Sequence, residues 1–132
     1  MAFEIINPES LGEPKGWNNG LLAPVGGRIL FVAGQTARDA EGRIVDGGFI
    51  PQFERALLNV LEVVRAAGGG PENIGRMTVF VTDRSTYLAQ LKELGTVWRR
   101  HLGRHYPAMT LVEVSDLVDE GAVVEIEATA VV

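Results

Sequence analysis

Apolar positions recur with two different periods along the chain, and each period predicts a different kind of element. Over residues 49–67, FIPQFERALLNVLEVVRAA, apolar residues recur at i, i+3 and i+4, which is the spacing of one buried helix face. Gly48 precedes this segment and three glycines at 68–70 follow it, so we expect the helix to begin and end there. A second helix is predicted over residues 86–102, with its cap in the segment 83–85.

Short runs of β-branched and aromatic residues predict about six strands. They lie at residues 3–7, 21–24, 29–34, 76–82, 110–114 and 123–131. We interpret LLAPVGGRILFVAG as a hairpin that turns at residues 24–27. The order β-ββ-α-β-α-ββ then predicts one α+β domain over residues 1–132. We expect a single sheet of about six strands with two helices packed on one face.

The strand in HYPAMTLVEV indicates that a single chain does not cover both faces of its sheet. Side chains alternate across a strand, so one face carries Met109, Leu111 and Glu113, and the other carries Thr110, Val112 and Val114. Both faces are largely apolar, yet two helices cover only one face of a sheet. We therefore expect a homo-oligomer that buries the helix-free face. A mildly hydrophobic sheet left exposed is the alternative.

Composition and charge narrow the function classes. The 132 residues include no cysteine, which excludes disulfides, thiolate nucleophiles and cysteine-ligated metals. Twelve basic residues face 17 acidic ones, for a net charge of −5, so nucleic acid is not an expected partner. The basic cluster WRRHLGRH at 98–105 is interpreted as the solvated end of a helix. No leader peptide or membrane-length apolar run is visible, so a cytoplasmic protein without membrane contact is expected.

Several segments, in this order along the chain, resemble the RidA/YjgF family of reactive-intermediate deaminases. They are AGQTA at 33–37, AAGG at 66–69, VFVTD at 79–83, HYPAMTLVEV at 105–114 and VEIEATAVV at 124–132. The resemblance covers about residues 17–132. It implies a chorismate-mutase-like fold, a homotrimer whose sheets form a central barrel, and small-molecule clefts between subunits. It also implies chemistry without a metal or other cofactor.

The resemblance further implies hydrolysis of 2-imino or enamine acids such as 2-aminoacrylate. In that family an arginine in the motif P-A-R-[ST] holds the substrate carboxylate, and a glutamate in the last strand positions the attacking water. Carried over by motif, the candidate catalytic residue is Glu125, and the candidate substrate-binding residues are Trp17, Ala33, Gly34, Met109 and Leu111. The motif here reads Pro-Ala-Met-Thr, so Met109 stands at the arginine position.

The loss of the arginine changes the expected ligand. A substrate carboxylate in this cleft would lose its paired charge, and an unpaired buried ion is costly. Met109, Leu111 and Trp17 predict an apolar, adaptable pocket for a neutral or partly aromatic ligand, so 2-aminoacrylate is not the expected substrate. Three functions stay open: an imine or enamine hydrolase, a non-catalytic binder of a small metabolite, and a ribonuclease, which the net charge disfavours.

The remaining polar candidates have structural interpretations. Glu113 is expected to form a structural ion pair, and Glu127 to be a structural or subunit-facing charge. His101 and His105 have the i, i+4 spacing of a metal-binding pair, but a glycine between them interrupts the helix, so no metal site is expected. Gly95 lies inside the second predicted helix at an expected cost of about 1 kcal/mol, which indicates a close approach by a neighbour.

Overall fold

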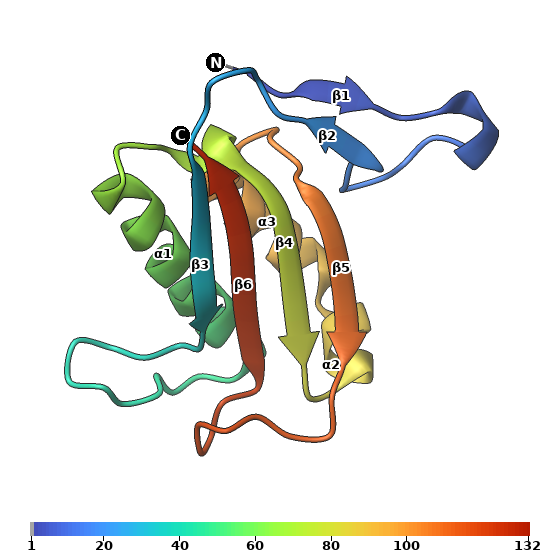
Figure 1. The fold of residues 1–132 in the computed structure, drawn as a ribbon. Coiled ribbons are helices and arrows are strands. Elements are labelled where there is room, and N and C mark those ends of the chain that lie inside the picture. The colour runs from blue at the N-terminus through green and yellow to red at the C-terminus, as the bar shows by residue number, and fades with distance from the viewer. Residues whose placement is uncertain (1) are drawn as a thin grey trace.

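The computed structural model describes residues 2–132 and has the predicted α+β architecture (Figure 1). Its strands and α-helices, in chain order, are β1 (Glu4–Ile6), β2 (Gly20–Leu22), β3 (Ile29–Gln35), α1 (Phe49–Ala66), β4 (Ile74–Val81), α2 (Arg84–Ala89), α3 (Leu91–Leu102), β5 (Ala108–Glu113) and β6 (Val124–Val131). Two short 3-10 turns lie at Glu9–Leu11 and Pro71–Asn73. The described chain therefore follows the predicted order of strands and helices closely, although the pairing of the strands differs.

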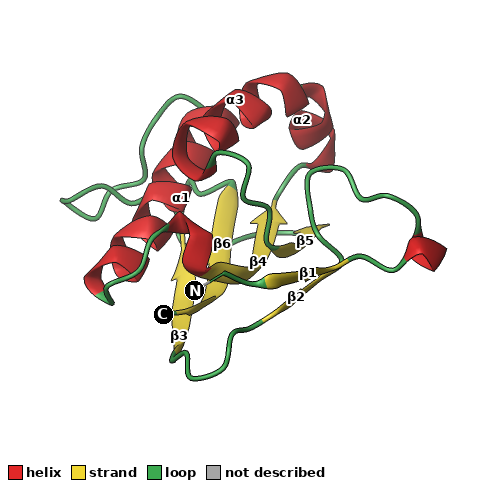
Figure 2. Cartoon of the chain, turned by 90° about the horizontal axis from the view of Figure 1, so that it is seen from above, coloured by secondary structure: helices red, strands yellow, loops and turns green. Residues whose placement is uncertain are grey.

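The main sheet has four strands in the order β3-β6-β4-β5. Strands β4 and β5 run parallel, and the other neighbours are antiparallel. A parallel pair needs a crossover connection, which α2 and α3 supply. All three helices lie on one side of this sheet, so its other side carries no helix (Figure 2).

The expected single sheet is wrong, because β1 and β2 pair with each other in a separate two-stranded sheet. The predicted hairpin between β2 and β3 does not form. Strand β3 pairs with β6 instead, and the backbone N–H of Arg28 extends that ladder by bonding the carbonyl of Val132 at 2.7 Å. On the other side of the proline-glycine segment, the N–H of Asn18 bonds the carbonyl of Pro107 at 3.2 Å, just before β5. Residues 23–27 therefore cross between two sheets, and the β1–β2 ribbon stands at one end of the molecule (Figure 1).

The first predicted helix is confirmed in α1, whose buried face follows the apolar period. Its buried residues are Phe49, Gln52, Phe53, Ala56, Leu57, Val60, Leu61 and Val64. Gly48 is the N-cap, and Gly68, with a φ of 89°, follows the C-terminus in a conformation that favours glycine. No helix within residues 2–132 is both long enough and apolar enough to cross a membrane.

The second predicted helix is divided into α2 and α3 at Gln90. The backbone of Gln90 has a φ of −121°, outside the helical range. Asp83 caps α2 as expected, because its carboxylate accepts hydrogen bonds from the N–H groups of Ser85 and Thr86. The bend lets α3 continue across the sheet toward α1.

The two faces of the main sheet have opposite character. Along β6, residues 124, 126, 128 and 130 are buried against the helices, whereas the positions between them face the other way. The helix-free face exposes large apolar side chains, with Phe31 78%, Ile29 64% and Val112 39% exposed. The predicted alternation of β5 is observed: Met109 and Leu111 pack against the core, while Val112 does not.

Candidate functional site

An apolar cavity of about 410 Å³ opens between β5, α3 and the loop before β2. Its lining residues are Lys15, Gly16, Trp17, Phe53, Val79, Tyr87, Leu91, Leu94, Gly95, Trp98, Arg99, Tyr106, Met109 and Leu111. Three residues predicted from sequence, Trp17, Met109 and Leu111, therefore share one pocket. The size and the aromatic lining are typical of a small-molecule site.

Asn18 holds the loop that carries Trp17 against the start of β5. Its side-chain amide donates to the carbonyl of Tyr106 at 2.6 Å, and its side-chain oxygen accepts from the amide of Asn7 at 2.8 Å. A backbone bridge also links Asn18 to Ala108. These contacts place Trp17 at the pocket although it is 90 residues or so from Met109 in the chain.

Two stacked aromatic rings fix one wall of the pocket. The rings of Trp98 and Tyr106 lie 6.2 Å apart between centroids, with an interplanar angle of 2°. The indole N–H of Trp98 donates to the carbonyl of His105 at 3.1 Å, so its polar atom is satisfied while its ring faces the cavity. This wall is preformed within a single chain.

Sequence reasoning missed the charged groups at this pocket. Arg99 and Lys15 both line it. Arg99 belongs to the basic cluster that was interpreted as a solvated helix end, and it is exposed, but its guanidinium also lies beside Gly95, one turn earlier in α3. The unexpected glycine inside the helix was the signal: the neighbour that approaches it closely is this guanidinium.

The other predicted site residues form a separate corner on the helix-free face. A bulge interrupts the β3–β6 ladder between Val32 and Gln35. The carboxylate of Glu125 lies directly against Gly34 in this bulge, so closely that a Cβ at position 34 would overlap the side chain of Glu125. Ala33, beside it, is exposed. Ala33, Gly34 and Glu125 are therefore together, and the glycine leaves the space that the carboxylate occupies beside the bulge.

One chain does not bring the two groups of residues together. Met109 and Leu111 face the helices from the edge strand β5, whereas Glu125 faces away from the helices on β6. Strand β4 lies between β5 and β6. A ligand in the apolar pocket of one chain therefore does not reach the Glu125 of the same chain through the sheet.

The other candidate carboxylates and histidines have identifiable surroundings. Glu113 accepts a hydrogen bond from the N–H of Arg84 at 2.7 Å, so it caps the start of α2 rather than forming the expected ion pair. Glu127 is exposed in a groove on the helix-free face. His101 contacts Glu54 at 2.6 Å and His105 contacts the carbonyl of Ile74 at 2.7 Å. Within residues 2–132, no three potential ligands among histidine, aspartate and glutamate cluster as a metal site would require.

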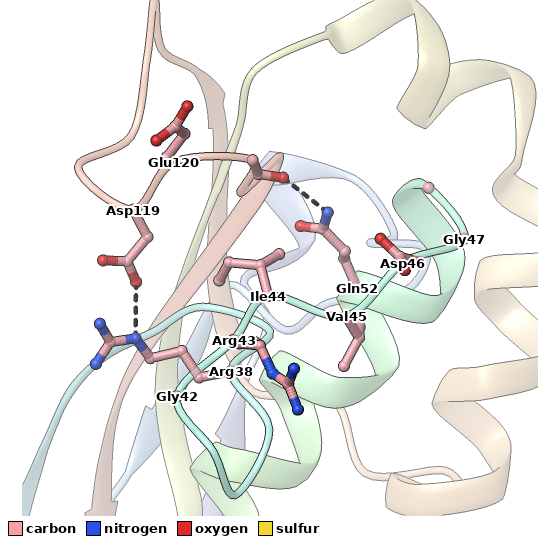
Figure 3. Close-up of a pocket in the computed structure, with 12 residues that line it drawn as sticks. Arg38, Gly42, Arg43, Ile44, Val45, Asp46, Gly47, Gln52, Asp119 and Glu120 are labelled. Atoms are coloured by element: carbon pink, nitrogen blue, oxygen red, sulfur yellow. Dashed lines mark hydrogen bonds and ion pairs between the residues drawn. The ribbon is translucent and has the colours of Figure 1, made fainter.

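A second, polar cavity of about 550 Å³ lies between the loop after β3 and the loop before β6 (Figure 3). Two of its charged side chains bind each other: Arg38 pairs with Asp119 at 3.3 Å, and the hydroxyl of Thr36 donates to the same carboxylate at 2.5 Å. The buried amide of Gln52 donates to the carbonyl of Gly121. We interpret this cavity as the junction that fixes both loops, and we place the candidate site at the apolar pocket and the Glu125 corner.

Comparisons with known proteins agree with the motifs. A family model described as Endoribonuclease L-PSP matches residues 16–132. Protein DfrA of Myxococcus xanthus is 34% identical over 132 residues, which cover 99% of this chain and 97% of DfrA. The 2-iminobutanoate/2-iminopropanoate deaminase of Capra hircus is 32% identical over 105 residues, or 79% of this chain and 73% of that protein.

Solved structures give the same result. The crystal structure of YyfB, a protein of unknown function of the conserved Rid family from Yersinia pestis, superposes with a TM-score of 0.87 at 31% identity, with both chains covered completely. The YjgF gene product of E. coli superposes with a TM-score of 0.70 at 27% identity, covering 95% of this chain and 92% of that one. The chain therefore belongs to the Endoribonuclease L-PSP family, the RidA/YjgF family whose motifs its sequence carries.

Proposed function

We propose that this protein is a homotrimeric Rid-family hydrolase that converts a small imine or enamine into a carbonyl compound and ammonia. The observation that carries the proposal is that the apolar pocket and the Glu125 corner lie on opposite faces of one sheet. The pocket of Trp17, Met109 and Leu111 lies on the helix side, and Glu125 lies on the helix-free side. A complete site then requires the pocket of one subunit and the Glu125 corner of another.

The exposed apolar face supports the assembly. Phe31 and Ile29 are large apolar side chains that remain largely exposed in one chain, and their burial by a second copy would be favourable. Three copies, with the sheets arranged as a barrel, are the assembly that the resemblance implies.

The chemistry needs only water and a carboxylate. Glu125 would take a proton from water as the water oxygen attacks the imine carbon, and would return that proton to the nitrogen as the C=N double bond becomes a C–N single bond. Glu125 would then carry the hydroxyl proton of the resulting carbinolamine to the nitrogen, so that the carbon–nitrogen bond breaks, ammonia leaves and the C=O bond forms. An enamine would first take a proton at carbon to become the imine. General acid–base assistance of this kind contributes about 10²–10⁴ in rate.

Relatives support the reaction class, and Met109 supports an alternative. The Capra hircus relative is named as a 2-iminobutanoate/2-iminopropanoate deaminase. Because Met109 replaces the arginine of the motif, a trimer that binds a small metabolite without converting it is the second candidate. No observation on the structure favours the ribonuclease named in the family description, and the net charge of −5 disfavours it.

The test measures keto acid release from imines generated in situ by an amino-acid oxidase acting on several apolar and aromatic amino acids. We expect the wild-type protein to accelerate release, and Glu125→Gln to lower the rate at least about 100-fold. Glu127→Gln is the matched control, because Glu127 lies on the same strand and the same face, two residues along.

Two outcomes would contradict this assignment in different ways. An unchanged rate in Glu125→Gln would remove Glu125 from the reaction. A wild-type protein that releases no keto acid from any imine, yet binds a small apolar molecule in the pocket, would favour the non-catalytic alternative.

A further inference from the structure

Two adjacent arginines of α3 have different surroundings. The guanidinium of Arg100 forms an ion pair with Glu54 of α1 at 2.7 Å. Arg99 lines the apolar pocket, and among residues 2–132 no carboxylate lies within ion-pair distance of it. A cation without a partner is therefore available at the edge of a cavity that is otherwise largely apolar and aromatic.

Gly95 gives the guanidinium of Arg99 its position. Side chains on a helix lean toward the preceding turn, so Arg99 covers the residue four positions earlier. A Cβ at Gly95 would lie 3.1 Å from Nη1 of Arg99, closer than ordinary van der Waals contact. Glycine at this position leaves room for the guanidinium beside the preceding turn of α3, at the pocket, whereas a larger side chain would require it to shift.

We propose that Arg99 is the anion anchor of this pocket, and that the ligand is a monocarboxylate with a large apolar or aromatic group. The inference rests on the proposed function in that the apolar pocket is taken as the ligand site. A guanidinium matches a carboxylate in a planar, bidentate geometry. The apolar group would lie against Trp17, the stacked Trp98 and Tyr106, and Met109.

This assignment revises the expectation from sequence. The methionine at position 109 indicated a neutral ligand, because the motif arginine is missing from β5. The structure places a guanidinium from α3 at the same pocket. The carboxylate would then enter from the helix side, while Met109 remains an apolar wall. Lys15, on the loop that carries Trp17, is the other cation at the pocket.

The test compares two ligands of nearly the same shape, 3-phenylpropanoate and 3-phenylpropanamide, in which a charged carboxylate is replaced by a neutral amide. Both tryptophans of the chain line the pocket, so intrinsic fluorescence of the full-length protein reports binding directly. We expect the wild-type protein to bind the carboxylate at least about tenfold more tightly than the amide. Arg99→Gln should bring that ratio close to one, and the ratio should fall with added salt.

Arg100→Gln is the matched control, since it removes the same charge from the next residue of the same helix, and we expect it to retain the preference. Arg99 is exposed, so its variant should fold, which its thermal unfolding curve would verify. Equal binding of both ligands by the wild-type protein, binding of neither, or loss of the preference only in Lys15→Gln would each overturn the assignment to Arg99.

The binding test of Arg99 and the hydrolase assay can fail independently of each other. Glu125→Gln removes the proposed base of the reaction but leaves Arg99 in place, so it should lose keto acid release while the protein still binds the carboxylate more tightly than the amide. Hydrolysis with no carboxylate preference would leave the proposed function standing and refute the anchor. A carboxylate preference without hydrolysis would support the anchor and favour the non-catalytic alternative.

Discussion

The two faces of the main sheet differ in how much of their apolar surface is buried within one chain. On the helix side, the buried residues of β4 and β6 pack against α1 and α3 with almost no exposure. On the other side, Phe31 is 78% exposed and the carboxylate of Glu125 lies against the bulge at Gly34. The helix side contains the core, whereas the helix-free side contains an exposed apolar surface and the Glu125 carboxylate, for which residues 2–132 supply no ion-pair partner.

The two parts of the proposed site lie on opposite faces of the sheet, and each is already formed within one chain of 132 residues. The apolar pocket is preformed, because the stacked Trp98 and Tyr106 and the bonds of Asn18 fix its walls within one chain. The Glu125 corner is also preformed, by a bulge and a glycine. In the proposed trimer, a second copy of the chain brings the pocket and the Glu125 corner together.

The largest effect is expected from charging the helix-free face. Phe31→Arg places a cation on the helix-free face that the proposed trimer buries, on strand β3 at the edge of the sheet, and an unpaired buried charge is costly at an interface. We expect the oligomer to dissociate to a folded monomer, and keto acid release to be lost with it. Native mass spectrometry gives the assembly, and circular dichroism shows whether the fold is retained.

Leu88→Arg is the matched control for this change. Leu88 is also an exposed apolar residue, but it lies on α2 in the helix layer. Its variant should keep the oligomeric state of the wild-type protein. A trimer that survives Phe31→Arg would show that the helix-free face is not the interface.

The spacing of apolar residues was enough to predict the helices and strands, because the buried positions of each element recur with the same spacing. The prediction of α1 over residues 49–67 agrees with the observed Phe49–Ala66, and the six strands lie close to their predicted positions. The predicted pairing of β2 with β3 was wrong, and the reason is physical. The turn residues at 24–27 indicated a hairpin, but the partner of each strand is set by contacts between distant residues, such as Asn18 with Tyr106.

The candidate site was predictable only in part. Strand alternation placed Met109 and Leu111 on one face, and the motif resemblance added Trp17. Arg99 could not be identified, because a basic cluster at the end of a helix is usually solvated. Two adjacent arginines point in directions about 100° apart on a helix, and only the packing of α3 on the sheet decides which of them meets the pocket.

The second largest effect is expected on the helix side, from removing the hydrogen bonds of Gln52. This buried polar residue joins α1 to the loop before β6. Its amide donates to the carbonyl of Gly121 at 2.9 Å, and its side-chain oxygen accepts from the N–H of Val123 at 2.9 Å. Gln52→Ala leaves both backbone groups without their partner, at an expected loss of about 2–4 kcal/mol in the free energy of unfolding.

Urea denaturation measures this loss, and Gln52→Met separates its causes. Methionine nearly preserves the side-chain volume but removes both hydrogen bonds, so it should lose most of the same stability. If Gln52→Met were as stable as the wild-type protein, the hydrogen bonds to this loop would contribute little, and packing would account for the effect of alanine.

The smallest effect concerns the ion pair between α1 and α3. The hydrogen bond from His101 is the main cause that lowers the pKa of Glu54 below its usual 4.5, and Arg100 adds to it. A carboxyl group with a lowered folded-state pKa contributes stability that is present above the unfolded value and is lost as the pH falls through the folded value. We therefore expect Glu54 to stabilise the fold at pH 6 and to lose that contribution at pH values well below 4.5.

The size of this contribution should be below about 1 kcal/mol, because Arg100 is largely exposed and surface pairs are screened. The measurement is the difference in urea midpoint between the wild-type protein and Glu54→Gln at pH 6 and again near pH 3. That difference should shrink at the lower pH, whereas Glu62→Gln, an exposed change on the same helix, should show no such trend. A difference that stays constant would mean that the contact of Glu54 with α3 acts through packing rather than charge, and that the helix layer is held together by apolar contacts alone.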